Sequence, residues 1–172
     1  REVFTFPIED YYKRVGFDFD KIPFSMLAHE YMEDYQEKSY ACDLHSDVLD
    51  VVNKAKNLGF SQTVLSASKM DYLLKQMETL HVDDLFDSIY GINDIYAKSK
   101  VELAHAFKQT CSLDDEIYFV GDSVHDYEVA KSIGAKCILV TTGHQNRATL
   151  ESVNVPVMDS LMESLDLIYE RD

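Results

Sequence analysis

The chain of 172 residues has the length of one domain with a small addition. Hydrophobic residues make up 46% of it, which is enough for a folded core and excludes a wholly disordered chain. Asp and Glu number 31 against 16 Lys and Arg, and the formal net charge of −15 disfavours binding to nucleic-acid phosphates and anionic membrane surfaces.

The cysteines and the start of the chain bear on its compartment. Cys42, Cys111 and Cys137 are odd in number and lack C-x-x-C spacing, so neither a disulfide framework nor a zinc site is predicted. No apolar run approaches the ~20 residues of a membrane helix, and the start, Arg1 to Phe4, lacks a signal-peptide pattern. The sequence therefore predicts a soluble cytoplasmic protein without membrane or nucleic-acid partners.

Residues 1–43 are predicted to form a small helical module. Residues 24–35 have the spacing of a helix, and no convincing strand occurs in the stretch. Aromatic side chains crowd this segment, which we interpret as a module set beside the rest of the chain.

Helical and strand patterns alternate from Ser46 onward. In order, the sequence predicts a helix between Ser46 and Gly59, a strand at 63–65, a helix capped by Ser68, a weak strand at 89–91, a helix at 99–110, a strand at 116–120, a helix at 126–133, a strand at 136–140 and a helix at about 160–170. Continuous apolar strands separated by amphipathic helices are typical of a parallel sheet covered on both faces. Residues 44–172 are therefore predicted to be an α/β domain with a doubly wound, Rossmann-like parallel sheet.

The candidate site residues follow the apolar strands. In an open parallel sheet, ligands bind beyond the carboxyl ends of the strands, where loop amides and helix N-termini point. Segments 66–68, 121–126 and 141–144 lie at that edge, and Lys98 and Lys100 precede the helix that leads into the central apolar strand. We expect these segments to converge on one crevice.

Two carboxylates stand out at this edge. Asp122 follows the apolar strand, and Asp126 comes one helical turn later on the same side. So placed, they suit Mg²⁺, which takes oxygen ligands and accepts the phosphate oxygens of a substrate. The residues alone also fit a helix start, with Asp122 as the cap and Asp126 favouring the helix dipole. Ser66 likewise suits a phosphoryl contact or a turn, and Lys100 suits an anionic partner or a solvated surface.

In this order the motifs resemble those of the haloacid dehalogenase superfamily, and most closely its phosphoglycolate phosphatase-like branch with a helical cap. The second, third and fourth motifs of that superfamily are matched by residues 63–68, 98–103 and 120–126. Lys100 aligns with the lysine of the third motif better than Lys98 does. The resemblance covers the whole chain and implies that residues 1–43 are part of the cap.

Carried onto these positions, the resemblance implies a site for phosphoryl transfer. Ser66 would hydrogen-bond the phosphoryl group, with Ala67 beside it in the substrate-binding segment. Lys100 would bind substrate and neutralise negative charge on the nucleophile and the phosphate. Asp122 would ligate Mg²⁺, and Asp126 would hold the lysine or a metal-bound water.

One motif of the superfamily has no counterpart. Members carry D-x-D-x-T after an N-terminal strand, and its first aspartate is the nucleophile. Residues 18–20 read Asp-Phe-Asp, but Lys21 and Ile22 follow, and residues 11–16 are too polar and basic for a buried strand. Because the chain also starts at Arg1 rather than at methionine, we expect the nucleophile to lie outside these residues. Its strand is central in the fold, so its absence would expose the flanks of two neighbouring strands.

The sequence thus predicts a Mg²⁺-dependent phosphatase that hydrolyses a small phosphorylated metabolite through an aspartyl-phosphate intermediate. A catalytically inactive phosphate-binding or interaction protein of the same fold is the alternative. A haloacid dehalogenase proper shares the fold but needs no metal, and Asp122 together with Asp126 favours phosphoryl chemistry over it. The sequence identifies neither the substrate nor the oligomeric state.

Overall fold

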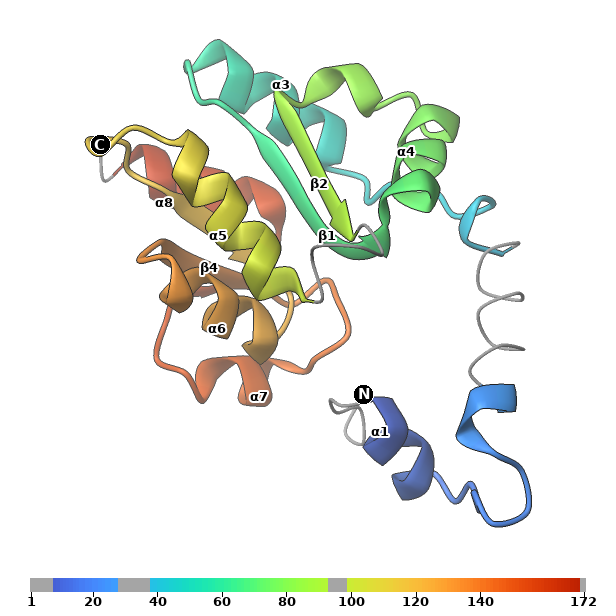
Figure 1. Cartoon of the computed structure of the whole chain (residues 1–172). Coiled ribbons are helices and arrows are strands. Elements are labelled where there is room, and N and C mark those ends of the chain that lie inside the picture. Colours follow the sequence, from blue (N-terminus) through green and yellow to red (C-terminus); the bar gives the residue numbers. More distant parts are fainter. Residues whose placement is uncertain (1–7, 28–37, 93–98, 171–172) are drawn as a thin grey trace. The chain divides into compact units, whose positions relative to one another are not determined.

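The computed structural model describes residues 8–27, 38–92 and 99–170 (Figure 1). The chain divides into two compact units, Arg1–Asp43 and Leu44–Asp172. None of the helices in these described ranges is both long enough and apolar enough to cross a membrane.

The first unit is held by aromatic side chains. It contains α1 (Ile8–Arg14) and a helical turn at residues 24–27. The ring of Tyr12 lies 5.1 Å from that of Phe17 and 5.8 Å from that of Phe24, and Phe19 lies 5.4 Å from Phe24. The described residues of this unit contain no strand, and most of the predicted helix at 24–35 lies outside them.

The second unit has the predicted alternation of helices and strands. Its elements are α3 (Val48–Asn57), β1 (Thr63–Lys69), α4 (Met70–Thr79), the 3-10 turn η1 (Asp83–Leu85), β2 (Ser88–Ile92), α5 (Lys100–Thr110), β3 (Tyr118–Gly121), α6 (Val124–Ser132), β4 (Lys136–Val140), α7 (Arg147–Glu151), β5 (Val157–Met158) and α8 (Leu161–Tyr169). The prediction of a parallel, doubly wound α/β domain is confirmed. The short elements α7 and β5 were not predicted, because five and two residues are too few to show a period.

The strands form two parallel sheets, β1–β2 and β3–β4–β5 (Figure 1). Val64 of β1 packs with α4, whereas its neighbour Leu65 packs with residues of α5, α6 and β3. Adjacent strand residues point to opposite faces, so α4 and α5 cover opposite faces of β1 and β2. The chain therefore winds outward from β1 to β2 and then returns across β1 to β3. The strand order reverses between β1 and β3, which is where doubly wound sheets bind ligands.

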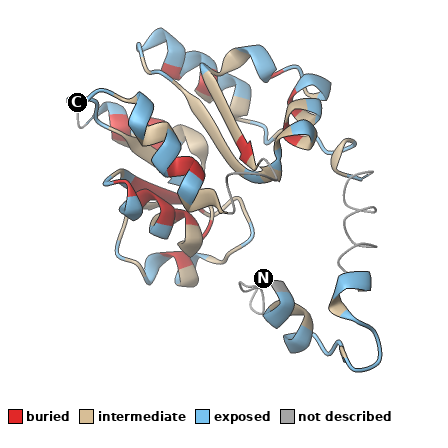
Figure 2. Ribbon diagram, viewed as in Figure 1, coloured by how far each residue is buried: buried red, intermediate tan, exposed pale blue. Residues whose placement is uncertain are grey.

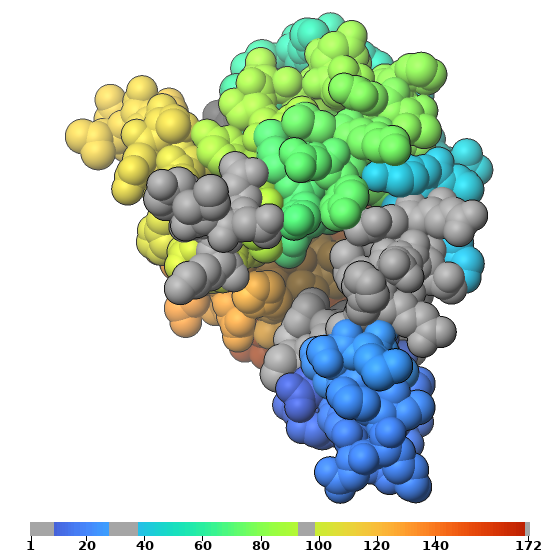
Figure 3. Space-filling view, turned by 45° about the vertical axis from the view of Figure 1, so that its right-hand side comes forward, coloured from blue at the N-terminus to red at the C-terminus, as the bar shows by residue number. Residues whose placement is uncertain are grey.

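Helix α5 joins the two sheets into one unit. It packs against β1 and β2 and also against α6, whose other contacts are with β3 and β4. The space-filling view shows the resulting surface of this unit, with the β1, α4 and β2 region in green and α6 and its neighbours in orange (Figure 3). The candidate residues on α5 and α6 are consequently neighbours.

Burial is deepest in β4 (Figure 2). Its last four residues are all buried, and Leu139 is 0% exposed. Helices α6 and α7 pack against it through Ala130 and Leu150, both also fully buried. The most deeply buried part of the core is therefore β4, which packs against α6, the helix that carries Asp126.

Three predicted helix starts are wrong. The N-cap position of α3 is occupied by Asp47 and not by Ser46. The carboxylate of Asp47 does not cap α3 but accepts a hydrogen bond from the amide of Leu161, in the first turn of α8, at 3.0 Å. Helix α4 follows Lys69, because Ser68 belongs to β1. Helix α6 starts two residues before Asp126.

Candidate active site

The turn from β3 into α6 is fixed by reciprocal hydrogen bonds. Ser123 precedes the helix, and its Oγ accepts from the amide of Asp126 at 3.2 Å. In return, Oδ2 of Asp126 accepts from the amide of Ser123 at 3.0 Å and from its hydroxyl at 2.7 Å. This is a capping box, and it corrects the structural alternative drawn from the sequence, because the N-cap is Ser123 and not Asp122.

Asp126 is a buried carboxylate with every oxygen occupied. It is 3% exposed. Its Oδ1 accepts from Nζ of Lys100 at 2.5 Å, and its Oδ2 also accepts from the amide of Asp122 at 3.0 Å. Burial alone would raise the pKa of Asp126, but the charge and hydrogen bond of Lys100, together with the bonds from Ser123 and from the Asp122 amide, hold this pKa below its usual range. Asp126 is therefore an ionised group that holds a lysine.

Lys100 is the first residue of α5. The helix begins after Ser99, whose Oγ accepts from the amide of Glu102 at 3.3 Å. A cation at a helix N-terminus is unfavourable, and the carboxylate of Asp126 compensates it. The side chain is 19% exposed and its Nζ lies 5.5 Å from the ring centre of Phe119. An ammonium has three donors, and among the described residues Asp126 is the hydrogen-bond partner of one of them, which leaves two for an anion.

Asp122 follows directly after β3 and lies partly exposed. Its Oδ2 accepts from the amide of His144 at 2.8 Å, and Nδ1 of the same histidine lies 3.2 Å from that oxygen. A Cβ on Gly143 would lie 1.8 Å from Oδ2 of Asp122, and one on Gly121 would lie 2.3 Å from Cβ of Asp126. The two glycines thus leave the space that the two carboxylates fill.

Ser66 and Ala67 lie within β1 rather than after it. The pairing of β1 with β2 shifts between Leu65 and Lys69, so residues 66–68 bulge out of the ladder. Oγ of Ser66 accepts from the amide of Ser68 at 3.1 Å. Within the described ranges no hydrogen bond joins Ser66 or Ala67 to the residues around Asp122.

The structure therefore brings three of the predicted site residues into one hydrogen-bonded cluster, Lys100, Asp122 and Asp126. Ser66 and Ala67 lie on the neighbouring strand at the same carboxyl edge. Lys98, the second candidate for the lysine, lies outside the described residues.

The sequence Asp-Phe-Asp at residues 18–20 forms a turn in the first unit. The carboxylate of Asp18 accepts from the amide of Asp20 at 3.1 Å and pairs with Nζ of Lys21 at 3.0 Å. Neither aspartate follows a strand. Their surroundings are those of a local turn, and nothing there resembles the strand end that a phosphoryl-transfer nucleophile needs.

The donor set fits a hydrated divalent cation. No group of three or more His, Cys, Asp or Glu side chains that could hold a metal occurs in the described part of the chain. Mg²⁺ is commonly bound through one or two carboxylates, with water and substrate phosphate completing its shell. Asp122 fits this role, because its hydrogen bonds to described residues all involve Oδ2 and none involves Oδ1.

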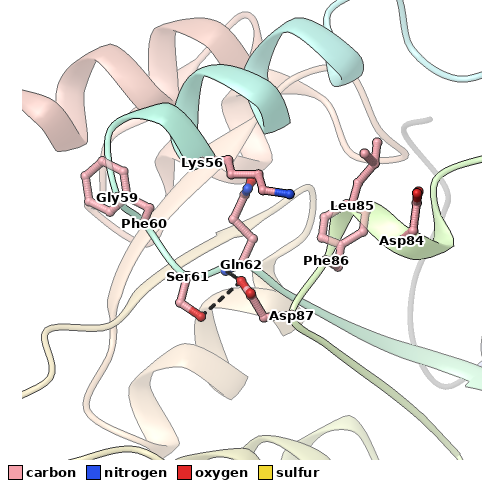
Figure 4. Close-up of a pocket in the computed structure, with 9 residues that line it drawn as sticks. All are labelled: Lys56, Gly59, Phe60, Ser61, Gln62, Asp84, Leu85, Phe86 and Asp87. Carbon is pink, nitrogen blue, oxygen red and sulfur yellow. Dashed lines mark hydrogen bonds between the residues drawn. The ribbon is translucent and has the colours of Figure 1, made fainter.

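A separate cavity of about 260 Å³ lies at the opposite end of β1 and β2 (Figure 4). It is at the amino ends of these strands, where the amide of Asp87 bonds to the carbonyl of Gln62. Hydrogen bonds from the Gln62 amide and the Ser61 hydroxyl lower the pKa of Asp87. Because ligands of doubly wound sheets bind at the carboxyl ends, this cavity is not part of the candidate site.

Two residues that hold the segment of Asp122 and Asp126 in place, Ser123 and Gln145, were not assigned a role from the sequence. Ser123 could have been found, because its spacing to Asp126 is that of a capping box. Gln145 could not, because its side-chain Oε1 accepts from the amide of Val124, which lies 21 residues earlier in the chain, at 2.7 Å.

Comparisons with known proteins agree with this architecture. The sequence profile of a haloacid dehalogenase-like hydrolase family matches residues 1–140. No curated protein sequence matches the chain significantly. Among solved structures, a haloacid dehalogenase-like family hydrolase from Streptococcus pneumoniae superimposes with a TM-score of 0.81 at 21% identity, covering 94% of this chain and 76% of that one.

Two further structures show the same fold. A predicted phosphatase from Clostridium acetobutylicum has a TM-score of 0.78 at 20% identity and covers 94% of this chain and 76% of its own. A predicted phosphoglycolate phosphatase from Haemophilus somnus has a TM-score of 0.69 at 18% identity, with 94% and 73% covered. At these identities the likeness concerns the fold.

Proposed function

Because the chain belongs to the haloacid dehalogenase-like hydrolase family, we propose that it serves in the Mg²⁺-dependent hydrolysis of a small phosphate monoester. The observation that carries the proposal is the cluster of Lys100, Asp122 and Asp126 at the point where the strand order reverses. The phosphatases among the structures of the same fold support it.

Lys100 is the residue proposed to bind the phosphoryl group. Its Nζ donates one hydrogen bond to Asp126, and with respect to the described part of the chain it has two further donors for phosphoryl oxygens. The buried carboxylate fixes the ammonium before substrate binds, so little reorganisation is needed as negative charge develops on the phosphoryl oxygens. Asp126 acts through Lys100 in this scheme.

Asp122 is proposed to hold Mg²⁺. When bound, the ion would neutralise charge on the phosphate oxygens. The partly exposed carboxylate leaves room for the water molecules that Mg²⁺ retains.

The bulge in β1 is proposed to supply further phosphate donors. Because residues 66–68 bulge out of the ladder, we propose that the Ser66 hydroxyl and the amide of Ala67 donate to the phosphate at the carboxyl edge. Donors of this kind, a hydroxyl with adjacent backbone amides, form anion-binding concavities in proteins.

The nucleophile is assigned to no described residue. We propose that it is a carboxylate at the end of a strand that pairs between β1 and β3, since in the described ranges β1 pairs with β2 alone and β3 with β4 alone. Its oxygen attacks phosphorus as the bond to the leaving alcohol breaks, which gives an aspartyl phosphate, and water then releases phosphate and restores the carboxylate.

The two units are proposed to divide the work. Residues 44–172 hold the residues of the proposed reaction, and residues 1–43 are proposed as part of a cap that selects the substrate.

We also propose that the protein is cytoplasmic. The three cysteines are free thiols, and burial raises the pKa of the Cys137 thiol to about 12, which keeps this thiol unreactive.

The test is hydrolysis of p-nitrophenyl phosphate with and without Mg²⁺. It is made on the chain alone and on the chain with an added N-terminal strand ending in D-x-D-x-T, and only the latter is expected to turn over. In the active form, Asp122→Asn should weaken the Mg²⁺ response and turnover together. Lys100→Ala should lower turnover about 10²–10³-fold, as the loss of a preorganised charge does.

Matched controls separate this result from general damage. Lys54→Ala removes an exposed lysine from another ion pair and should leave turnover unchanged. Lys98→Ala should also have little effect, and a larger effect there than at Lys100 would move the phosphate-binding role to Lys98. An unchanged Mg²⁺ titration in Asp122→Asn would refute the metal assignment.

A phosphate-binding protein without turnover is the second candidate. It is favoured by the described residues themselves, among which the only carboxylate that follows a strand beside Lys100 is Asp122, the proposed metal ligand. Phosphate binding by the strand-extended chain that depends on Lys100, without hydrolysis, would establish this function instead.

A further inference from the structure

We propose that the loop between β4 and α7, residues 141–145, is a clamp that positions the Asp122 carboxylate for a divalent cation, with Gly143 and Gln145 as its positioning residues. The inference rests on the proposed function, because it concerns the proposed ligand Asp122. It goes beyond that function in assigning the orientation of this ligand to a segment about 20 residues further along the chain.

The contacts of the loop with Asp122 involve one carboxylate oxygen, Oδ2. The amide of His144 donates to Oδ2 of Asp122 at 2.8 Å, and the ring of the same residue lies 3.2 Å from that oxygen. A main-chain donor is fixed by the path of the loop and holds the carboxylate in one rotamer. With Oδ2 held by the loop, Oδ1 is the oxygen presented to a cation.

Gly143 makes this approach possible. A Cβ at this position would lie 1.8 Å from Oδ2 and 2.2 Å from Cβ of Asp122, which is far inside van der Waals contact. The backbone of Gly143 is not among those with positive φ, unlike Gly134 at the end of α6. The glycine is therefore needed for space beside Asp122 and not for its backbone conformation.

Gln145 ties the loop to the segment that carries Asp122. Its Oε1 accepts at 2.7 Å from the amide of Val124, which is the first residue of α6. A first-turn amide has no partner within its own helix, so this bond satisfies a donor that would otherwise need water. The loop is thus attached two residues after Asp122 as well as to Asp122 itself.

The next residue supplies a matched control. Asn146 is the N-cap of α7, and its side chain accepts from the amide of Thr149 at 2.9 Å. Like Gln145, it accepts a hydrogen bond from an amide in the first turn of a helix, but that helix is α7 and not α6. Asn146→Ala should therefore cost stability without changing the orientation of Asp122.

The experiment uses Mn²⁺ as the probe, since it takes the same oxygen ligands as Mg²⁺ and broadens nearby NMR signals even when bound weakly. In the full chain, Mn²⁺ is expected to broaden the amide signals of Asp122, Gly143 and His144, and Asp122→Asn should abolish the effect. Gly143→Ala and Gln145→Met should each raise the Mn²⁺ concentration for half broadening about 10-fold, as the loss of partners that orient a ligand does.

Two variants distinguish positioning from folding. Gln145→Glu keeps the acceptor and should retain Mn²⁺ binding, and Asn146→Ala should bind like the wild type although it melts at a lower temperature. Wild-type affinity in both Gly143→Ala and Gln145→Met would overturn the clamp and leave the proposed metal site standing. No broadening around Asp122 in the wild type would instead overturn the proposed metal site, and the clamp's role with it.

Discussion

The two halves of the second unit bury equally apolar residues to very different extents, since Val64 and Leu65 of β1 are half-buried whereas Ile138 and Leu139 of β4 are 1% and 0% exposed. In β4 the last four residues are buried, whereas β1 contains no buried residue and β2 buries only Gly91. Strand β4 has a paired strand on each side, and β1 has one on a single side in the described structure. The comparison teaches that an apolar sequence makes a strand, but its neighbours decide how far it is buried.

The largest expected effect contrasts the two halves directly. Leu139→Ala in β4 should destabilise the chain by about 2–5 kcal/mol, because the side chain is 0% exposed and its removal leaves a cavity. Leu65→Ala in β1 should cost clearly less, because Leu65 is only half-buried. Urea denaturation of both variants measures the difference, and equal losses would show that β1 is as tightly packed as β4.

The next prediction concerns the ion pair that joins the halves, Lys100 of α5 with Asp126 of α6. Lys100→Met should lower the free energy of unfolding by about 2 kcal/mol. This is below the range for a fully buried pair, because the lysine is 19% exposed. The control is Lys54→Met, which breaks a pair of the same 2.5 Å length to Asp166 between two exposed side chains. That change should cost at most about 1 kcal/mol.

A double-mutant cycle decides whether the loss belongs to the pair. Combining Lys100→Met with Asp126→Asn should cost less than the two single changes added together, because the carboxylate left uncompensated in the first variant is then neutral. Strict additivity would show that each residue acts through other neighbours.

Acid should weaken this connection between the halves. The pKa of Asp126 is depressed in the folded state, so its contribution is fully present above the unfolded value of about 4 and is lost as pH falls through the lower folded value. The stability difference between wild type and Asp126→Asn should therefore shrink below about pH 4. Urea denaturation from pH 7 to pH 3 measures it, and a constant difference would contradict the assignment.

The smallest effect is expected at the open edge of β3. Val120 is 38% exposed although it lies in an apolar strand, so Val120→Thr should change stability by no more than about 0.5 kcal/mol. Val140→Thr in β4 is the matched change at a buried site and should cost about 1–3 kcal/mol for the desolvated hydroxyl. With a strand added between β1 and β3, the cost at Val120 should rise toward that at Val140.

Much of the candidate site could be predicted because it follows from local order along the chain. Asp122 comes after an apolar strand, and in a parallel sheet such residues meet at one edge. The start of α8 near residue 160 was also predicted, and the structure confirms it with Ser160 as the N-cap, a contact over three residues. Lys100 was selected over Lys98 because it aligns better with the lysine of the third motif.

Other features depend on contacts that no local pattern contains. Asp47 looks like a cap for α3 but caps α8, more than a hundred residues later. Ser68 looks like a helix cap but lies in a bulged strand, because pairing with β2 continues to Lys69. Gln145 has no sequence signal at all.

The sequence by itself determined the α/β class, four of the five described strands and the family, because hydrophobic periodicity and short motifs are set by residues a few positions apart. Only the tertiary structure decided that Asp126 holds Lys100, that a distant loop holds Asp122, and that equally apolar residues of β1 and β4 differ in burial. The physical reason is that these contacts join segments brought together by packing, where a few tenths of a nanometre decide whether a hydrogen bond forms.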